Sequence, residues 1–188
     1  MSDRDYCYPP DYTVLRNRLG IRDAPALEAA ERELVAQRLL EPVPAGDFDL
    51  DHLKAIHRHL FQDVYPWAGE IRTVEIAKGG SRFQPRRFIA AGMADVHRRI
   101  VEAGYFRGME PDGFAEGAGP VLGDVNHVHP FREGNGRTQL QYLKQLAARA
   151  GHAIDLTRLD RAAWLDASRR SNTGDHEAIT RCIRRALV

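Results

Sequence analysis

Apolar residues recur every three or four positions through most of this 188-residue sequence. The spacing is most regular after Pro85, where Ile89, Met93, Val96 and Ile100 follow one another at these intervals. Side chains spaced in this way lie on one face of an α-helix, which turns once every 3.6 residues. Similar stripes predict further helices at 27–40, 53–60, 114–125, 140–150, 162–168 and 175–187. Because such helices bury their apolar faces against one another, the sequence predicts an all-α fold.

Several residues are of the types that begin, end or interrupt helices. Asp23 suits the capping position of one first turn, Asp47 and Asp49 are both candidates to cap the next helix, and Gly151 suits a C-terminal stop. The stripe at 114–125 contains Pro120, which lacks an N–H group and costs about 3 kcal/mol in a helix interior. We therefore expect that helix to be kinked.

One segment has a period of two in place of the helical period. Between residues 71 and 83, Val74 and Ile76 alternate with the polar side chains of Thr73 and Glu75. Lys78-Gly79-Gly80 then offers residues suited to a tight reversal. This pattern predicts a single β-hairpin.

The bulk composition suits one domain without a general affinity for polyanions. A chain of 188 residues lies in the size range of single domains. Lys and Arg number 27 against 26 for Asp and Glu, so the net charge of +1 gives no broad attraction to nucleic acid or to an anionic membrane. We expect neither as a direct partner.

The distribution of cysteines and apolar residues favours a cytoplasmic protein. Cys7 and Cys182 form no metal-binding or disulfide pattern, which suits a reducing compartment. Residues 1–10 lack the apolar core of a secretion signal, and no run approaches about 18 consecutive apolar residues.

One nine-residue segment, His-Pro-Phe-Arg-Glu-Gly-Asn-Gly-Arg, leads into a predicted helix. Gly134 and Gly136 have no side chains to hold a ligand away, so backbone N–H groups at the helix N-terminus can point at a phosphate. Glu133 offers a carboxylate for Mg²⁺, which usually binds through one or two carboxylates and the substrate phosphates. Arg137 can neutralise charge on a phosphate, and His129 can accept a proton from a hydroxyl near neutral pH. The segment therefore predicts phosphate chemistry.

Two other interpretations of this segment remain open. His127, His129 and Glu133 can in principle gather around Zn²⁺ in a metal hydrolase, although Pro130 does not suit a helical ligand pair and the glycines would have no role. The segment can also belong to a module that binds a nucleotide or a partner without catalysis. Each residue taken singly is more often structural, but their combination within nine positions favours the catalytic interpretation.

The nine residues match the signature of the Fic family, His-x-Phe-x-(Asp/Glu)-Gly-Asn-Gly-Arg, at every fixed position. Tyr65–Val74 and Lys78–Phe83 resemble the family's β-hairpin flap and the approach to it, and Leu15–Leu40 resembles the N-terminal helices of its bacterial toxin members. The resemblance implies a Fic-type helical bundle with one β-hairpin flap beside the active-site loop. Its expected parts are N-terminal helices at about 10–40, a core and flap at about 48–151, and C-terminal helices at about 158–188.

The resemblance also implies a protein adenylyltransferase, which moves AMP from ATP onto a Ser, Thr or Tyr hydroxyl of a target protein. His129 would deprotonate that hydroxyl, Glu133 would bind Mg²⁺, and Phe131 would anchor the loop. The residues expected at the nucleotide are Gly134, Asn135, Gly136, Arg137, Lys78, Gly79 and Asn172. The residues expected to pair main chain to main chain with the target are Thr73, Val74, Glu75 and Ile76.

Two positions bear on the nucleotide donor. Gly136 stands where the kinase-like Doc branch has Lys, which favours transfer of AMP over transfer of the γ-phosphate. Leu140 stands where the longer family signature has a second Arg, which contacts the γ-phosphate and receives an inhibitory Glu. The loss of a charged contact typically costs about 1.5 to 3 kcal/mol, which slows turnover without abolishing it. A different nucleotide donor, or an inactive nucleotide-binding module, is therefore the alternative function.

The resemblance also suggests how the activity is regulated. Self-inhibiting Fic proteins carry Ser/Thr-x-x-x-Glu-Gly/Asn, and the nearest segment here, Thr173–Glu177, is followed by Ala178. We therefore expect a small separate antitoxin, as in a toxin–antitoxin pair. Subunits of DNA gyrase and topoisomerase IV are targets of similar bacterial toxins, and they are the candidate targets here.

Overall fold

Seven α-helices make up most of the computed structural model, which describes residues 3–78 and 81–188. They are α1 Ala24–Arg38, α2 Leu50–Phe61, α3 Ile89–Glu102, α4 Pro111–Val128, α5 Asn135–Ala150, α6 Arg161–Ser171 and α7 Glu177–Ala186. Short 3-10 turns lie at Asp3–Tyr6, Arg86–Phe88, Gly104–Phe106 and Leu156–Arg158. The predicted all-α class is confirmed.

Helix ends lie where the capping residues of the sequence predict them. The Asp49 carboxylate accepts the backbone N–H of His52 at 2.8 Å and caps α2, and Asp23 caps α1 in the same way. α5 ends at Gly151, whose φ of 100° lies in the left-handed region that favours glycine. Local sequence therefore fixes the boundaries of these three helices.

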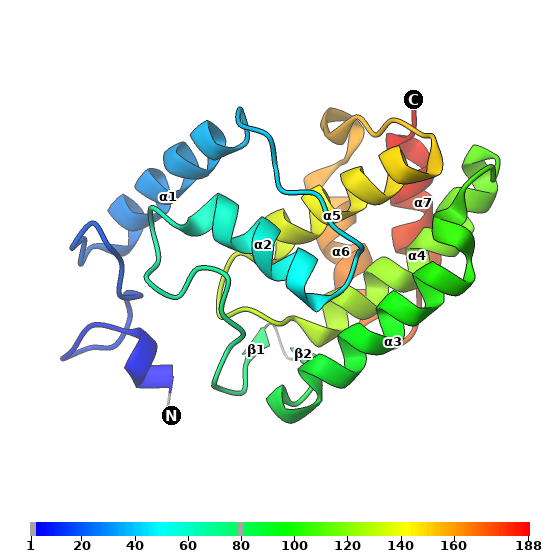
Figure 1. Cartoon of the computed structure of the whole chain (residues 1–188). Coiled ribbons are helices and arrows are strands. Elements are labelled where there is room, and N and C mark those ends of the chain that lie inside the picture. The colour runs from blue at the N-terminus through cyan, green and yellow to red at the C-terminus, as the bar shows by residue number, and fades with distance from the viewer. Residues whose placement is uncertain (1–2, 79–80) are drawn as a thin grey trace.

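α4 lies in the middle of the bundle, in contact with α3, α5, α6 and α7 (Figure 1). The helix expected at 114–125, for which we predicted a kink, corresponds to α4. The structure shows α4 as one continuous helix that runs through Pro120. A Cβ atom at Gly119 would lie 2.0 Å from Oγ1 of Thr180, and one at Gly123 would lie 2.2 Å from Nδ1 of His176. These glycines therefore allow α7 and the residue before it to approach the α4 backbone closely.

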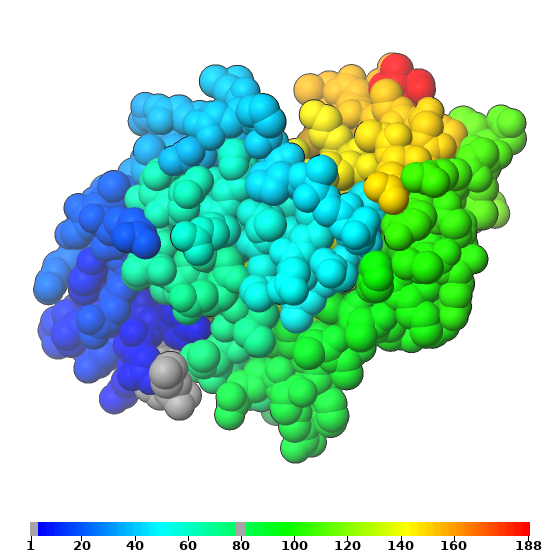
Figure 2. All heavy atoms as spheres, in the orientation of Figure 1, coloured from blue at the N-terminus to red at the C-terminus, as the bar shows by residue number. Residues whose placement is uncertain are grey.

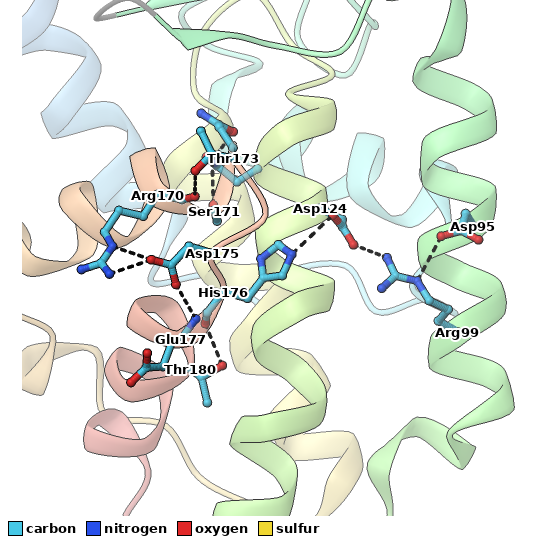
Figure 3. Close-up of polar contacts among 12 residues, drawn as sticks. Asp95, Arg99, Asp124, Arg170, Ser171, Thr173, Asp175, His176, Glu177 and Thr180 are labelled. Atoms are coloured by element: carbon cyan, nitrogen blue, oxygen red, sulfur yellow. Dashed lines mark hydrogen bonds and ion pairs between the residues drawn. The ribbon is translucent and has the colours of Figure 1, made fainter.

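Polar contacts fix the start of α7 over α4 (Figure 3). Arg99 of α3 pairs with Asp124 of α4, and Nε2 of His176 lies 4.0 Å from the same carboxylate. Arg170, in the last turn of α6, pairs at 2.6 Å with Asp175 in the turn that leads to α7. Such partly exposed pairs contribute little stability singly, so their main effect is on geometry.

Pairing in the region expected to form a hairpin is limited to two short strands. β1, Ala77–Lys78, is antiparallel to β2, Ser81–Arg82. Within the described residues the period-two segment Thr73–Ile76 joins no strand ladder, and the chain bends at its first two residues. A hairpin over residues 71–83 is therefore not confirmed, and Gly79 lies outside the described residues.

The N-terminal segment and α1 cover one side of the molecule, beside α2 (Figure 2). The expected N-terminal helices at about 10–40 consist of α1 alone, because residues 10–23 contain turns and extended chain. In the part of the chain that the structure describes, no helix combines the length and the apolar character needed to cross a lipid bilayer.

Candidate active site

The motif segment joins the end of α4 to the start of α5 (Figure 1). His129 follows α4 in a left-handed conformation, with φ of 45°, and turns the chain away from the helix. Gly134 precedes α5 with φ of 82°, and a Cβ atom there would lie 2.5 Å from the Phe61 ring. Both the backbone conformation and the space therefore require glycine at position 134.

The first turn of α5 is open toward solvent. A Cβ atom at Gly136 would meet nothing within 4 Å, and this residue is exposed. Amides in the first turn of a helix have no acceptor within the helix, and the helix dipole adds partial positive charge. The N-terminus of α5, from Asn135 to Arg137, is therefore suited to hold a phosphate.

His129 lies on a cavity of about 360 Å³ between the motif loop and the residues that lead into β1. Its Nδ1 lies 3.0 Å from the carbonyl oxygen of Asn126. A carbonyl can only accept, so Nδ1 carries the proton and Nε2 carries the lone pair of the neutral ring. The ring also stacks on Phe83, with the ring centres 3.7 Å apart. These contacts orient the imidazole as a base.

Glu133 lines the same cavity as His129. One of its carboxylate oxygens accepts the N–H of Gly134 at 2.9 Å, which fixes the carboxylate beside the N-terminus of α5. Mg²⁺ needs only one or two carboxylates when substrate phosphates supply further oxygens, so this donor set suits Mg²⁺.

Arg137 is held by a buried carboxylate from α1. Its guanidinium pairs with Glu31, which is only 7% exposed, and lies 4.7 Å from the centre of the Phe61 ring. Glu31 also accepts the hydroxyl of Tyr65, and burial together with this carboxylate raises the pKa of Tyr65. Sequence reasoning missed Glu31, although its position between Leu27 and Val35 on the inward face of α1 is an available signal.

The interior of the motif loop is braced by side chains. Phe131 is fully buried, as expected of an anchor, and stacks on His57 with ring centres 3.9 Å apart. The Asn135 side chain accepts the Phe131 N–H at 3.0 Å and donates to its carbonyl at 2.8 Å. Asn135 thus closes the turn with its side chain and presents only its backbone to a ligand.

His57 of α2 is a second residue that sequence reasoning missed. The N–H of Gly69 donates to its Nδ1 at 2.8 Å, so Nε2 carries the proton and donates to the carbonyl of Glu133 at 3.0 Å. Burial lowers the pKa of His57 to about 4, so the ring is neutral at physiological pH. His57 lies four residues after Leu53 and three before Leu60, so a polar residue on the apolar face of a predicted helix was an available signal.

Arg72 is the third missed residue, and its side chain is fully buried. Its Nε donates to the carbonyl of His129 at 2.9 Å, and its Nη1 donates to the carbonyl of Val74 at 2.8 Å. Burial lowers the pKa of this guanidinium. Arg72 is in step with Val74 and Ile76 in the period-two segment, so its place on the apolar face was an available signal that it is buried.

The residues expected to bind the target are divided between two environments. Val74 is buried, and the N–H of Thr73 donates to the Tyr6 hydroxyl at 3.1 Å. Glu75 and Ile76 line the cavity beside His129. The part of this segment that faces the active site therefore begins at Glu75.

The remaining nucleotide-binding candidates belong to other elements than the motif loop or lie outside the described residues. Lys78 is in β1, and Gly79 lies outside the described residues. Asn172 ends α6, and its side-chain oxygen accepts from Asn126 at 3.0 Å. Since the Asn126 carbonyl orients His129, Asn172 contacts the residue that positions the base.

A zinc hydrolase is disfavoured by the arrangement of side chains. Among residues 3–78 and 81–188, no three His, Cys, Asp or Glu side chains are grouped to hold a metal ion. His127, His129 and Glu133 therefore do not form the ligand set that this alternative requires.

Comparisons with known proteins identify the family. A sequence profile of the Fic/DOC family matches residues 47–147. The chain belongs to the Fic/DOC family. A relative from Sinorhizobium fredii, named a probable protein adenylyltransferase, is 39% identical over 182 residues, which cover 96% of this chain and 94% of the relative.

Two further relatives of this Fic protein support the assignment. The protein adenylyltransferase VbhT of Bartonella schoenbuchensis is 39% identical over 95% of this chain and 38% of that protein. The N-terminal Fic domain of a cell filamentation protein from Bartonella quintana, solved with bound ADP, has a TM-score of 0.89 at 26% identity. The match covers 98% of this chain and 94% of that one.

Leu140 of this Fic protein packs against the core. It is half-buried and packs against the apolar cluster of the bundle, one helical turn from Arg137. A leucine in this position stabilises the packing of α5 but cannot bind a phosphate.

Proposed function

We propose that this protein is a protein adenylyltransferase, which transfers AMP from ATP to a hydroxyl group of another protein. The observation that carries the proposal is the orientation of His129. The Asn126 carbonyl holds the proton on Nδ1, so the lone pair of the neutral ring is on Nε2, and His129 lines a cavity together with Glu133. Relatives named protein adenylyltransferases support the same function.

The proposed reaction begins with proton transfer from the target hydroxyl to Nε2 of His129. The oxygen attacks the α-phosphorus of ATP, a new P–O bond forms, and the bond to the β-phosphate oxygen breaks so that pyrophosphate leaves. The amides at the start of α5 and the Arg137 guanidinium would stabilise the charge on the phosphates. Glu133 would hold Mg²⁺, which supplies further positive charge to the phosphates when bound.

The segment leading into β1 is the proposed docking site for the target. Glu75, Ile76 and Ala77 line the cavity beside His129, so an extended peptide paired with them would bring its side chains toward the imidazole. Thr73 and Val74 would support this edge from within the fold. Lys78, Gly79 and Asn172 remain the candidates for further nucleotide contacts.

The biological setting is also part of the proposal. We infer a cytoplasmic toxin that is held in check by a small antitoxin, because the sequence has no good match to the self-inhibitory pattern of the family. Subunits of DNA topoisomerases are the candidate targets. Recovery of no small partner from the native host, together with no toxicity on expression alone, would contradict this setting.

A different nucleotide donor is the second candidate function, and it rests on two observations. Leu140 supplies no charge to a γ-phosphate, and Arg137 already shares its charge with Glu31. A donor with fewer or differently placed phosphates would suit a phosphate site with this smaller positive charge.

Labelled nucleotides separate these possibilities. Host lysate is incubated with ATP labelled at the α- or the γ-phosphate, with the native protein or with His129→Ala. Adenylyl transfer predicts protein labelling from α-labelled ATP only, and loss of that labelling in the variant. Labelling from the γ-phosphate would identify a kinase, and no labelling from either would favour another donor or a binding module.

A further inference from the structure

The side chain of Arg72 joins two parts of the site that have to be aligned for the proposed reaction. One is the segment between Val74 and Gln84, which we call the docking segment. It carries β1, β2 and the residues proposed to dock the target. The other is the end of α4 with His129. The guanidinium lies between them with its side chain fully buried.

All five N–H groups of the guanidinium are directed at acceptors. Nε donates to the His129 carbonyl at 2.9 Å, and Nη2 donates to the Val128 carbonyl at 3.4 Å. Nη1 donates to the Val74 carbonyl at 2.8 Å, and Nη2 donates to the Gln84 carbonyl. The Glu75 carboxylate, 3.3 Å from Nη1, takes the remaining donor. Both ends of the docking segment and the backbone of the base therefore share one rigid, planar group.

Two backbone hydrogen bonds strengthen the same junction. The N–H of Arg72 donates to the Pro130 carbonyl at 2.8 Å, and the N–H of Gln84 donates to the His127 carbonyl at 2.9 Å. The N-terminal segment contributes a further contact, because the Tyr6 hydroxyl accepts the N–H of Thr73 at 3.1 Å. The docking segment is thus fixed to the α4 terminus at both of its ends.

Register is the reason why this junction matters for the reaction. Successive residues of an extended peptide are about 3.3 Å apart, and a slip of one residue turns its side chains to the opposite face. Proton transfer requires the hydroxyl within about 2.6 to 3.2 Å of the base. The docking segment must therefore hold its position relative to His129 to within a fraction of one residue.

We propose that Arg72 is a positioning residue that sets this alignment and thereby determines which hydroxyl of the target is modified. It acts through the carbonyls of Val74, Gln84 and His129 and touches no substrate. This inference rests on the proposed adenylyltransferase function and on docking of the target along Glu75–Ala77.

The test compares Arg72→Lys with the native protein and with Arg98→Lys, an exposed arginine of α3 that serves as a matched control. Lysine keeps the charge but presents a compact ammonium that cannot span both segments. The substrate is the lysate protein that the native enzyme labels most strongly from α-labelled ATP, purified for the assay. Affinity for ATP, kcat and KM for this protein, and the modified residues mapped by mass spectrometry are measured for each variant.

We expect Arg72→Lys to bind ATP within about two-fold of the native protein, because Arg72 contacts none of the phosphate-binding residues. Transfer is expected to fall about 100-fold, the usual cost of a misplacement near 1 Å, and modification is expected to spread to neighbouring hydroxyls. Arg98→Lys should match the native protein in all readouts. Transfer at native rate to the same single hydroxyl by Arg72→Lys would overturn the inference.

A second variant covers the case in which Arg72→Lys does not fold. Tyr6→Phe removes only the hydroxyl that holds Thr73, and we expect a few-fold loss of transfer with partial spreading of the modified sites and unchanged ATP affinity. An unaltered site pattern in this variant would count against the inference. Failure of the proposed function itself is recognised separately, because the native protein would then label no lysate protein.

Discussion

We predict that Gly134→Ala and Gly136→Ala affect different properties of the protein. The first should lower its stability, and the second should lower its affinity for ATP. Gly134 has a left-handed backbone, which costs a residue with a Cβ atom about 1 to 2 kcal/mol. The new methyl group would also lie 2.5 Å from the Phe61 ring, and overpacking of this kind costs about 1 to 3 kcal/mol. Gly134→Ala should therefore lower the free energy of unfolding by about 2 to 5 kcal/mol.

Gly136→Ala is the matched comparison. A Cβ atom there meets nothing within 4 Å, so the free energy of unfolding should change by less than about 0.5 kcal/mol. The methyl group would stand beside the amides proposed to hold the phosphates, and ATP affinity should fall about ten-fold or more, a cost of about 1.4 kcal/mol. Urea unfolding and calorimetric titration with ATP and Mg²⁺ measure the two effects. Equal destabilisation by both variants, or native ATP affinity in Gly136→Ala, would refute the reasoning.

Three further predictions concern packing, pH and the metal. Gly123→Ala should destabilise the protein by about 1 to 3 kcal/mol in urea, because its methyl group would meet the ring of His176; native stability would show that α7 packs differently. His57 has a pKa of about 4 in the fold against an ordinary value near 6.5, so the unfolded chain binds the proton more tightly. The associated stability is present above about pH 6.5 and should decline by about 3 kcal/mol as the pH falls to 4, with a flatter profile in His57→Asn; equal profiles would contradict this origin. Glu133→Gln should bind ATP without Mg²⁺ as the native protein does but lose the gain in affinity that Mg²⁺ confers, and a retained gain would place the metal elsewhere.

Much of the fold was predictable because local sequence determines it. The apolar stripes predicted the helices, and Asp23, Asp49 and Gly151 marked helix ends that the structure shares. The segment Thr73–Ile76 was not predictable in the same way. Its alternation reflects burial of Val74 against the core and exposure of Glu75, and strand pairing is confined to residues farther along.

The candidate site was predictable where one contiguous segment encodes it. His129, Glu133 and Asn135 line one cavity because they belong to one short contiguous segment, which includes the two glycines. Glu31, His57 and Arg72 come from other elements, and their contacts with the loop depend on tertiary packing that periodicity does not reveal. The available signal was a polar residue in register with apolar ones, as at Glu31, at His57 between Leu53 and Leu60, and at Arg72 in step with Val74.

The most direct test of the proposed chemistry is a single-turnover measurement of AMP transfer by purified His129→Ala, made alongside its affinity for ATP. Because Nε2 of His129 is the proposed base, transfer should fall by about 10²- to 10⁴-fold while ATP affinity stays within a few-fold of native. Transfer within ten-fold of the native rate would contradict the role of His129 as the base.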